Sequence, residues 1–510
     1  RRERHFHIGS PLSSLPMSEA RPAGLLRSFP KVFWVANVME LFERAAYYGL
    51  NSVLAVYLTA DVAKGGLGFG ESSVGFLQSL IYACTYVVPI LGGALADRYG
   101  YRRMLLVCFA LLSTGYFAAG YMSSYAAVFA ALLVMATGGG LFKPIISGTI
   151  ARSTNESNSG FGFGIYYWMI NLGAFLAPLV VSILKGFSWR YVFLASSAYV
   201  ALMFLPTLFA VTDPPRPAST KTLRQVLVGA AEVLGDSRFM LMIVVYSLFW
   251  ILYFQNFGSV LWFLRDFIDP APMNAVFSSL GLPFRFDAEF VTVINAGTII
   301  LLQVFVSRIV KDLKPLPTML GGVAIGALGF LCLAFAQTVW LFIAGIAVFS
   351  IGEMTAHPKY YSYVGLVAPQ DKKAVYMGYA FLYGVFGSLI GSSLGGALYG
   401  AWLKPLAGSP EGITASRNFW LLFVLLDVFA VVGLFFYNRS FAHDTPAANA
   451  KARAIMIGLY ALFVVVGAFF LWKALFGGDE VSYKTLVQAL ILTLLGVGGV
   501  LISRKKRPEA

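Results

Sequence analysis

Charged residues are scarce in this chain, and cysteine is nearly absent. Asp, Glu, Lys and Arg make up only 12% of its 510 residues, whereas 58% are hydrophobic. A soluble domain carries about 25% charged residues, so this composition excludes an ordinary globular protein. The three cysteines, Cys84, Cys108 and Cys332, lie in apolar runs without metal-ligand or disulfide spacing. They predict buried thiols and no metal site.

Several functional signals are missing as well. The first segment, RRERHFHIGSPLSSLPMSEARPAG, lacks the apolar core of a secretory signal peptide and predicts a disordered cytoplasmic tail over residues 1–30. No P-loop and no zinc signature occurs, so we expect neither an enzyme nor a bound cofactor. The formal net charge is +14, but the basic residues sit mostly between apolar runs, where they set membrane topology. A nucleic-acid partner is therefore not expected.

What the chain has in abundance is apolar runs of about 20 residues, each long enough to cross a bilayer. They predict an all-α polytopic membrane protein, integral to the plasma membrane. The basic loop DRYGYRR and the basic C-terminal segment SRKKR predict that both termini lie in the cytoplasm. The expected spans are 31–59, 73–97, 103–121, 125–150, 161–184, 189–211, 239–263, 288–310, 318–336, 338–365, 374–401, 417–437, 455–475 and 485–503.

The order of these spans predicts two six-helix bundles and an additional pair of helices. The expected parts are the tail 1–30, an N-terminal bundle 31–211, a cytoplasmic linker 212–238, a C-terminal bundle 239–437, a cytoplasmic loop 438–454, an extra transmembrane pair 455–503 and a basic cytoplasmic tail 504–510. Two bundles packed face to face place a substrate site at the midplane between them. For the extra pair, peripheral packing and a partner-protein contact both stay open.

The stretch MELFERAAYYGLN puts ionisable groups in the middle of the first span. Its polar residues fall on one helical face: Glu40, Glu43, Arg44, Tyr47, Tyr48 and Asn51. Such a face must meet a protein interior or a water-filled cavity, because a charge in lipid costs several kcal/mol. Two carboxylates share one guanidinium, so repulsion and desolvation favour the uptake of a proton. The stretch predicts proton coupling through Glu40, Glu43 and Arg44, with a structural ion cluster as the alternative.

Two other spans carry ionisable groups. In GGGLFKPIISG, Lys143 lies mid-span before Pro144 and needs an anionic partner from the protein or the substrate, unless it snorkels to the interface. In GEMTAHPKYYSY, Glu353 and His357 lie one turn apart. This pair suits proton transfer or a cationic substrate group. A hydrogen-bonded core histidine is the alternative for His357.

The loop GGALADRYGYRR joins the second and third spans. Gly93 and Gly100 allow a tight turn. Asp97, Arg102 and Arg103 are expected to clamp one bundle to the other in one conformation and to release it in the next. A role of the arginines in setting topology is compatible with this clamp.

These stretches together resemble the proton-dependent oligopeptide transporters, or peptide/nitrate transporters, of the major facilitator superfamily. ELFERAAYYG resembles the family's E-x-x-E-R motif, GIYYWMINLGAFLAP its fifth-helix signature, GEMTAHP its tenth-helix motif, and GLFKP supplies a fourth-helix lysine. The resemblance implies a major facilitator fold and proton coupling through the first-helix motif. It also implies a peptide site that includes Tyr47, Tyr48, Tyr167 and Asn171, with Lys143 and Glu353 paired across the bundles.

Two positions depart from the family pattern. Peptide-transporting members usually have an arginine where this chain has Asn51, and a seventh-helix glutamate where it has Phe254, ahead of Gln255. In the family these two positions can form an ion pair at the outer gate. Replacing a whole buried pair can be nearly neutral for stability, whereas removing one member is costly. The double departure therefore predicts a changed site, which we expect to include Asn51 and Phe254.

Three functions are compatible with the sequence. The first is a proton-coupled symporter of small peptides or peptide-like, amine-bearing solutes, driven by the proton gradient. The second keeps the scaffold but moves a less anionic, non-peptide solute with altered or no proton coupling. The third is a non-transporting membrane subunit or sensor. The expected partners are the solute, protons and the lipid bilayer.

Overall fold

The computed structural model describes residues 28–155, 158–213, 225, 229, 232–369, 372–476 and 483–504, and every regular element in these ranges is a helix. The N-terminal half holds α1 (Lys31–Asn51), α2 (Leu54–Thr59), η2 (Val62–Lys64), α3 (Glu71–Val87), α4 (Pro89–Tyr99), α5 (Tyr101–Tyr121), α6 (Tyr125–Arg152), α7 (Ser159–Leu184), α8 (Trp189–Ala201) and α9 (Phe204–Ala210). The C-terminal half holds α11 (Ser237–Gln255), α12 (Ser259–Phe267), α13 (Ala271–Ser279), α14 (Phe290–Val310), α15 (Pro315–Ala334), α16 (Val339–Val367), α17 (Lys373–Tyr379), α18 (Leu382–Leu398), η4 (Tyr399–Leu403), η5 (Lys404–Leu406) and α19 (Pro410–Ser440). Two further helices follow, α20 (Pro446–Phe476) and α21 (Tyr483–Arg504).

Helices occupy all of the predicted spans, so the predicted class of multi-pass, all-α membrane protein is confirmed. Among the described residues, 12 helical spans are long and apolar enough to cross a membrane, and the bent pair α3–α4 makes a thirteenth. α1 has a comparable length but carries the charged group around Glu43. The predicted domain limits stay predictions. Most of both terminal tails and much of the linker 212–238 lie outside the described residues.

Several predicted spans are broken into two helices, and the breaks have local causes. Pro89 lacks a backbone N–H, and α3 and α4 meet there at 43°. Between α1 and α2, the side chains of Asn51 and Ser52 donate to the carbonyl oxygens of Tyr47 and Gly49. Such bonds compete with the helical pattern and help to end α1. The break places Asn51 at the last position of α1.

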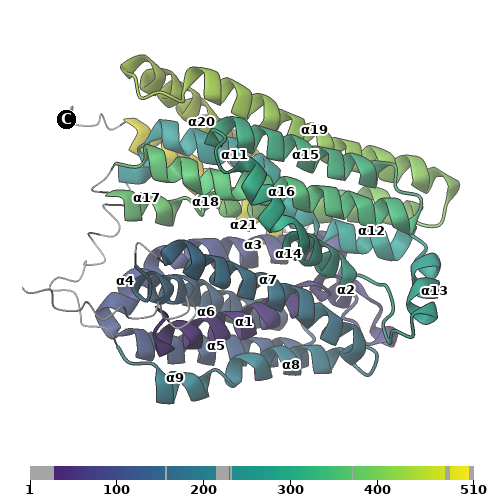
Figure 1. Ribbon diagram of the computed structural model, residues 1–510. Coiled ribbons are helices and arrows are strands. Elements are labelled where there is room, and N and C mark those ends of the chain that lie inside the picture. Colours follow the sequence, from purple (N-terminus) through teal and green to yellow (C-terminus); the bar gives the residue numbers. More distant parts are fainter. Residues whose placement is uncertain are drawn as a thin grey trace, which may run out of the picture.

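The two halves form two helical layers, stacked in Figure 1 with the N-terminal half below and the C-terminal half above. We call the side at which α1 begins and α21 ends the terminal side, and the side of α2, α12 and α13 the far side. The bundles touch along two seams, α3 against α18 and α7 against α14. In the first seam the backbones cross closely: a Cβ atom on Gly75 would lie 2.8 Å from the Cα of Gly396. Two glycines thus permit this close approach.

The additional helices α20 and α21 form a tight hairpin that contacts both bundles. Glycines bring the two helices together, since a Cβ on Gly496 would lie 2.6 Å from the carbonyl oxygen of Tyr460. α20 packs along α11 of the C-terminal bundle. At the far side, Lys484 of α21 donates to the hydroxyl of Ser73 on α3 and lies 5.5 Å from the ring centroid of Tyr125 on α6. The hairpin therefore reaches from one bundle to the other.

Candidate functional site

The charged group of α1 lies inside the N-terminal bundle. Arg44 Nε donates to Glu43 Oε2 at 2.5 Å and lies 3.4 Å from Glu40 Oε1. The guanidinium carbon is 5.1 Å from the ring centroid of Tyr47, within range of a cation–π contact. One guanidinium therefore serves two carboxylates, as the sequence predicts. Among the described residues, Arg44 is the only cation that forms an ion pair with these two carboxylates.

A cavity of about 880 Å³ lies between the bundles, next to this group. Both halves contribute to its wall, and residues near the terminal-side ends of their helices, such as Ser147 and Phe163, line it as well. The lining residues that bear on the argument are Glu40, Arg44, Tyr48, Tyr86, Lys143, Tyr166, Tyr167, Asn171, Trp250, Tyr253, Asn295, Glu353, His357, Tyr361, Phe381 and Tyr383. The predicted residues Glu43, Tyr47, Asn51 and Phe254 are not part of this wall. Charged side chains therefore lie in a cavity wall that is rich in aromatic residues.

Lys143 and Glu353 face the same cavity from opposite bundles but are not paired in this conformation. Lys143 Nζ lies 4.7 Å from the ring centroid of Tyr86, and no ion pair of Lys143 occurs within the described ranges. Glu353 Oε2 accepts a hydrogen bond of 3.0 Å from Asn295 Nδ2, which also donates to Ser350. The cavity therefore presents one unpaired cation and one carboxylate that is bound only by a neutral amide. A solute with both charges would meet a partner for each.

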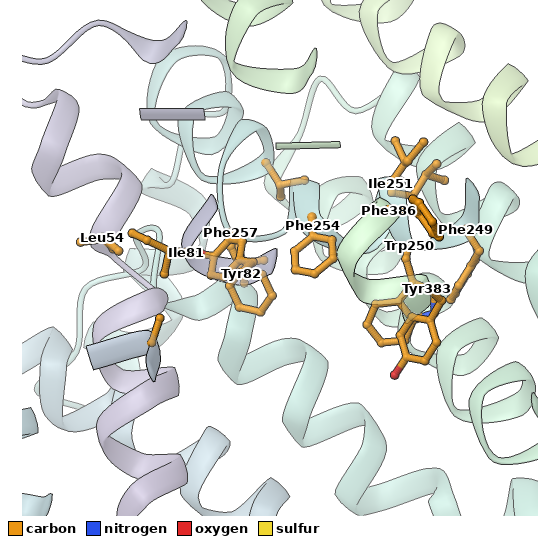
Figure 2. Close-up of a cluster of buried hydrophobic side chains, with 14 of the residues drawn as sticks. Leu54, Ile81, Tyr82, Phe249, Trp250, Ile251, Phe254, Phe257, Tyr383 and Phe386 are labelled. Atoms are coloured by element: carbon orange, nitrogen blue, oxygen red, sulfur yellow. The ribbon is translucent and has the colours of Figure 1, made fainter. Parts of the chain in front are cut away.

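Asn51 and Phe254 lie on the far side of the cavity, where they form a neutral plug with Tyr82. The Tyr82 hydroxyl donates to Asn51 Oδ1 at 2.9 Å, and its ring stacks on Phe254 with centroids 5.2 Å apart. Gln78 reaches across the seam and donates to the carbonyl oxygen of Phe257 at 2.7 Å. Figure 2 shows Tyr82 beside Phe254 and Phe257, with further apolar side chains of both bundles around them. We call Gln78, Tyr82, Asn51, Phe254 and Phe257 the far-side plug.

The plug explains why the two sequence departures occur together. Asn51 and Phe254 are only 1% and 2% exposed, and both contact Tyr82. The amide of Asn51 is used twice, since Nδ2 also donates to the carbonyl oxygen of Tyr47. Neither side chain is available to a solute in this conformation. A hydrogen-bonded aromatic stack occupies the place where an ion pair could otherwise join the bundles.

An ion cluster at the far side joins α7 to α14. Lys185 Nζ lies 2.5 Å from Asp287 Oδ2 and 2.6 Å from Glu289 Oε2, across the two bundles. Burial raises the pKa of the Glu289 carboxyl, and Lys185 offsets only part of this rise. Burial lowers the pKa of Lys185, but Glu289 and Asp287 outweigh burial, so that pKa is raised overall. We call Lys185, Asp287 and Glu289 the far-side latch. Because the pKa values of Glu289 and Lys185 are both raised, each of these two groups binds its proton more tightly than it would in water.

The predicted clamp residues lie at the terminal side of the N-terminal bundle. Gly100 adopts a φ of 96°, which favours glycine, and a Cβ there would meet the Asp213 carboxylate. Asp97 accepts from the Tyr101 hydroxyl at 2.9 Å, and Arg102 donates to Asp213 and Leu208. Gly93 packs near Pro144, and Arg103 is exposed. All of these hydrogen bonds join residues of the N-terminal bundle to one another or to Asp213, which follows α9. None of them reaches the C-terminal bundle, so a clamp between the bundles remains a prediction.

Several cavity residues carried no motif in the sequence. Asn295, Tyr86, Trp250 and Tyr383 come from four different helices, and each is a single residue in an apolar run. The one available signal was Asn295, because a lone amide in a spanning helix needs a partner. Its partner Glu353 is 58 residues away in the chain. Only the packing of α14 against α16 brings them together.

Comparison with known proteins gives the family. A family description for the Major Facilitator Superfamily matches residues 38–286 and 271–507, almost the whole chain. The chain belongs to the major facilitator superfamily. The resemblance to oligopeptide transporters is also confirmed: a di-/tripeptide transporter of Lactococcus lactis subsp. lactis is 31% identical over 228 residues. An uncharacterised transporter of Bacillus subtilis is 30% identical over 214 residues.

These matches cover 41% and 39% of this chain and 43% and 42% of the relatives, so the chain spans less than half the length of the curated relatives it matches. Solved structures extend the likeness in fold. A peptide transporter of the POT family in complex with sulfate has a TM-score of 0.67 at 20% identity, over 80% of this chain and 95% of its own. A POT family transporter in complex with 5-aminolevulinic acid has a TM-score of 0.65, over 81% and 99%. At this identity the structures show the fold alone.

Proposed function

We propose that the protein is a proton-coupled symporter of small peptides or peptide-like, amine-bearing solutes. The observation that carries this proposal is the cavity between the bundles, which exposes Lys143 on one wall and Glu353 on the other. A zwitterionic solute has the complementary charges. The relatives named di-/tripeptide transporters support the same class of solute. No cofactor is needed, because the proton gradient supplies the driving force.

The proposed mechanism is alternating access by rocking of the two bundles. In the described conformation the far-side plug and the far-side latch close one side, while the cavity wall extends toward the terminal side. We place the protein in the plasma membrane with both termini on the cytoplasmic side. The cavity then extends toward the cytoplasm, so this conformation is inward-facing. A proton taken up by the group of Glu40, Glu43 and Arg44 would remove its excess negative charge. Proton release to the cytoplasm would restore that charge and complete the cycle.

The test is uptake of a mixed dipeptide pool into proteoliposomes with an imposed pH gradient. We expect uptake to collapse with an uncoupler and in Glu43→Gln, because the variant removes a carboxylate that Arg44 holds. Glu411→Gln is the matched control, since Glu411 is exposed at the start of α19. Uptake that is indifferent to both the uncoupler and Glu43→Gln would refute proton coupling.

A second candidate is a carrier of a less anionic, non-peptide amine. The observation that favours it is the far-side plug, which withdraws Asn51 from the cavity and offers no arginine there. A thermal-shift screen separates the candidates, because a bound solute stabilises the folded state by mass action. If amines raise Tm and di- and tripeptides do not, the peptide proposal fails and the second candidate stands.

A further inference from the structure

His357 is held in a fixed orientation by its surroundings. It lies on α16 one turn from Glu353, and both side chains line the cavity. The rings of Trp250, Tyr361 and Tyr383 surround the imidazole, with centroids 5.1, 5.1 and 5.6 Å away and steep interplanar angles. These contacts come from three different helices. They restrict the orientation of the ring in the cavity wall.

The remaining neighbour of His357 decides which ring nitrogen carries the proton. Nδ1 of His357 lies 3.4 Å from the hydroxyl of Tyr246, which is fully buried. Within the described ranges, this hydroxyl has no hydrogen-bond acceptor other than Nδ1. A buried hydroxyl that donates to nothing is costly, so Tyr246 donates and Nδ1 accepts. In a neutral imidazole the proton then sits on Nε2.

We propose that His357 is a specificity-determining residue whose Nε2–H donates to a backbone carbonyl oxygen of the bound peptide. The inference rests on the proposed function and assigns the amino group of the peptide to Glu353 and Asn295. On a helix, residues four apart have Cβ atoms about 5–6 Å apart. Consecutive Cα atoms of a peptide are about 3.8 Å apart, so one residue of the peptide, together with the side chains, covers this gap.

This arrangement selects peptides over simple amines. An amine without a carbonyl group satisfies Glu353 but leaves the Nε2–H of His357 unpaired in an aromatic wall. A site that is built to donate a hydrogen bond disfavours a ligand without the acceptor, because its own polar group then loses a partner. Water in the cavity weakens the penalty. We expect a preference of about tenfold.

The experiment compares a peptide with a ligand that lacks the peptide group, and therefore lacks both its carbonyl acceptor and its amide N–H. The variants of His357 and Tyr246 isolate the part of the preference that is due to the carbonyl acceptor. The probes are alanylalanine and its alkene isostere, in which a carbon–carbon double bond replaces the peptide group. Kd is measured for both on the purified full-length protein. The unmodified protein should bind alanylalanine about tenfold more tightly than the isostere. In His357→Phe this preference should shrink, because the part due to the carbonyl acceptor is lost, while the affinity for the isostere stays unchanged.

Two further variants keep the proposal falsifiable if His357→Phe does not fold. His357→Gln retains a side-chain N–H donor and should keep part of the preference. Tyr246→Phe frees Nδ1 and allows the proton on either nitrogen, so the preference should fall while the affinity for the isostere stays. A preference that survives in full in His357→Phe or Tyr246→Phe overturns the inference. Equal binding of both ligands by the unmodified protein overturns it too, whereas binding of amines without any binding of alanylalanine overturns the proposed function itself.

Discussion

Asn51 and Phe254 show how two residues on different bundles depend on each other. In the far-side plug both contact Tyr82, which is itself fully buried. A single charge introduced here would have no partner and no water. The structure therefore constrains the two positions jointly, either as a neutral stack or as an ion pair.

This coupling can be measured with a double-mutant cycle. Asn51→Arg and Phe254→Glu should each lower the free energy of unfolding by about 3–5 kcal/mol, since each buries an unpaired charge. The double variant Asn51→Arg/Phe254→Glu should lose less than the sum, with a coupling of about 1–3 kcal/mol. Chemical unfolding in detergent gives all four values. Additive losses would show that positions 51 and 254 do not meet across the seam.

At the residue scale, the sequence predicted what lies on one helix. Glu40, Glu43 and Arg44 are close together because residues three and four apart share a helical face. The far-side latch was not predictable, since Lys185 follows the predicted span 161–184 and Glu289 lies at the very start of the predicted span 288–310. A charge at either place needs no partner inside the membrane. The contact between Lys185 and Glu289 joins segments 104 residues apart. Such a contact depends on how whole bundles pack, which no local pattern encodes.

At the element scale, the crossing of α3 and α18 sets how closely the bundles approach. A Cβ on Gly75 would lie 2.4 Å from the carbonyl oxygen of Ser392, which is backbone and cannot turn aside. The sequence contains 51 glycines, and their number alone did not show which of them meet another helix. The spans were predictable from length and hydrophobicity, but their partners were not.

Gly75→Leu should therefore separate α3 from α18 at the far side. We expect the variant to populate a conformation open to that side, which a cysteine introduced at the far side reports by faster labelling with a membrane-impermeant maleimide. Gly321→Leu on α15 is the control, because no atom of another described helix lies within 4 Å of the added Cβ. Equal labelling rates in the two variants would argue against the crossing as a determinant of closure.

At the scale of the whole molecule, the far-side latch makes closure depend on pH. Burial raises the pKa of Glu289 in the closed state above its ordinary value of 4.5. The closed state therefore binds a proton more tightly than an open state in which Glu289 meets water. The stabilisation is fully present below about pH 4.5 and is lost as the pH rises through the raised pKa. Opening of the far side should become more frequent over this range.

Glu289→Gln should remove that pH dependence. The same cysteine-labelling assay, run from acid to neutral pH, should show a rising rate in the unmodified protein and a flat rate in Glu289→Gln. Asp61→Asn is the control on the same side, since Asp61 is largely exposed. A slope that persists unchanged in Glu289→Gln would place the responsible group elsewhere.

The hairpin of α20 and α21 is expected to restrain the rocking motion. Lys484 of the hairpin contacts Ser73 and Tyr125 of the N-terminal bundle. Lys484→Ala should loosen the far side without changing the cavity, so the labelling rate should rise while Kd for a bound solute stays the same. Lys64→Ala, an exposed lysine on the same side, is the control. An unchanged rate in Lys484→Ala would mean that the hairpin is only peripheral.

The position of the hairpin also bears on the axis about which the bundles turn. The hairpin bridges α11 and the start of α3, next to the seam between α3 and α18. Among the described residues, no comparable element bridges the bundles at the other seam, between α7 and α14. A body tied along one edge rotates about that edge, so the opposite edge travels further. Spin labels placed in pairs across each seam should therefore show a larger change in distance between α7 and α14 than between α3 and α18. The route into the site from the far side would then lie beside α7 and α14, where Asp287, at 45% exposure, is the first charge of the far-side latch that a solute meets.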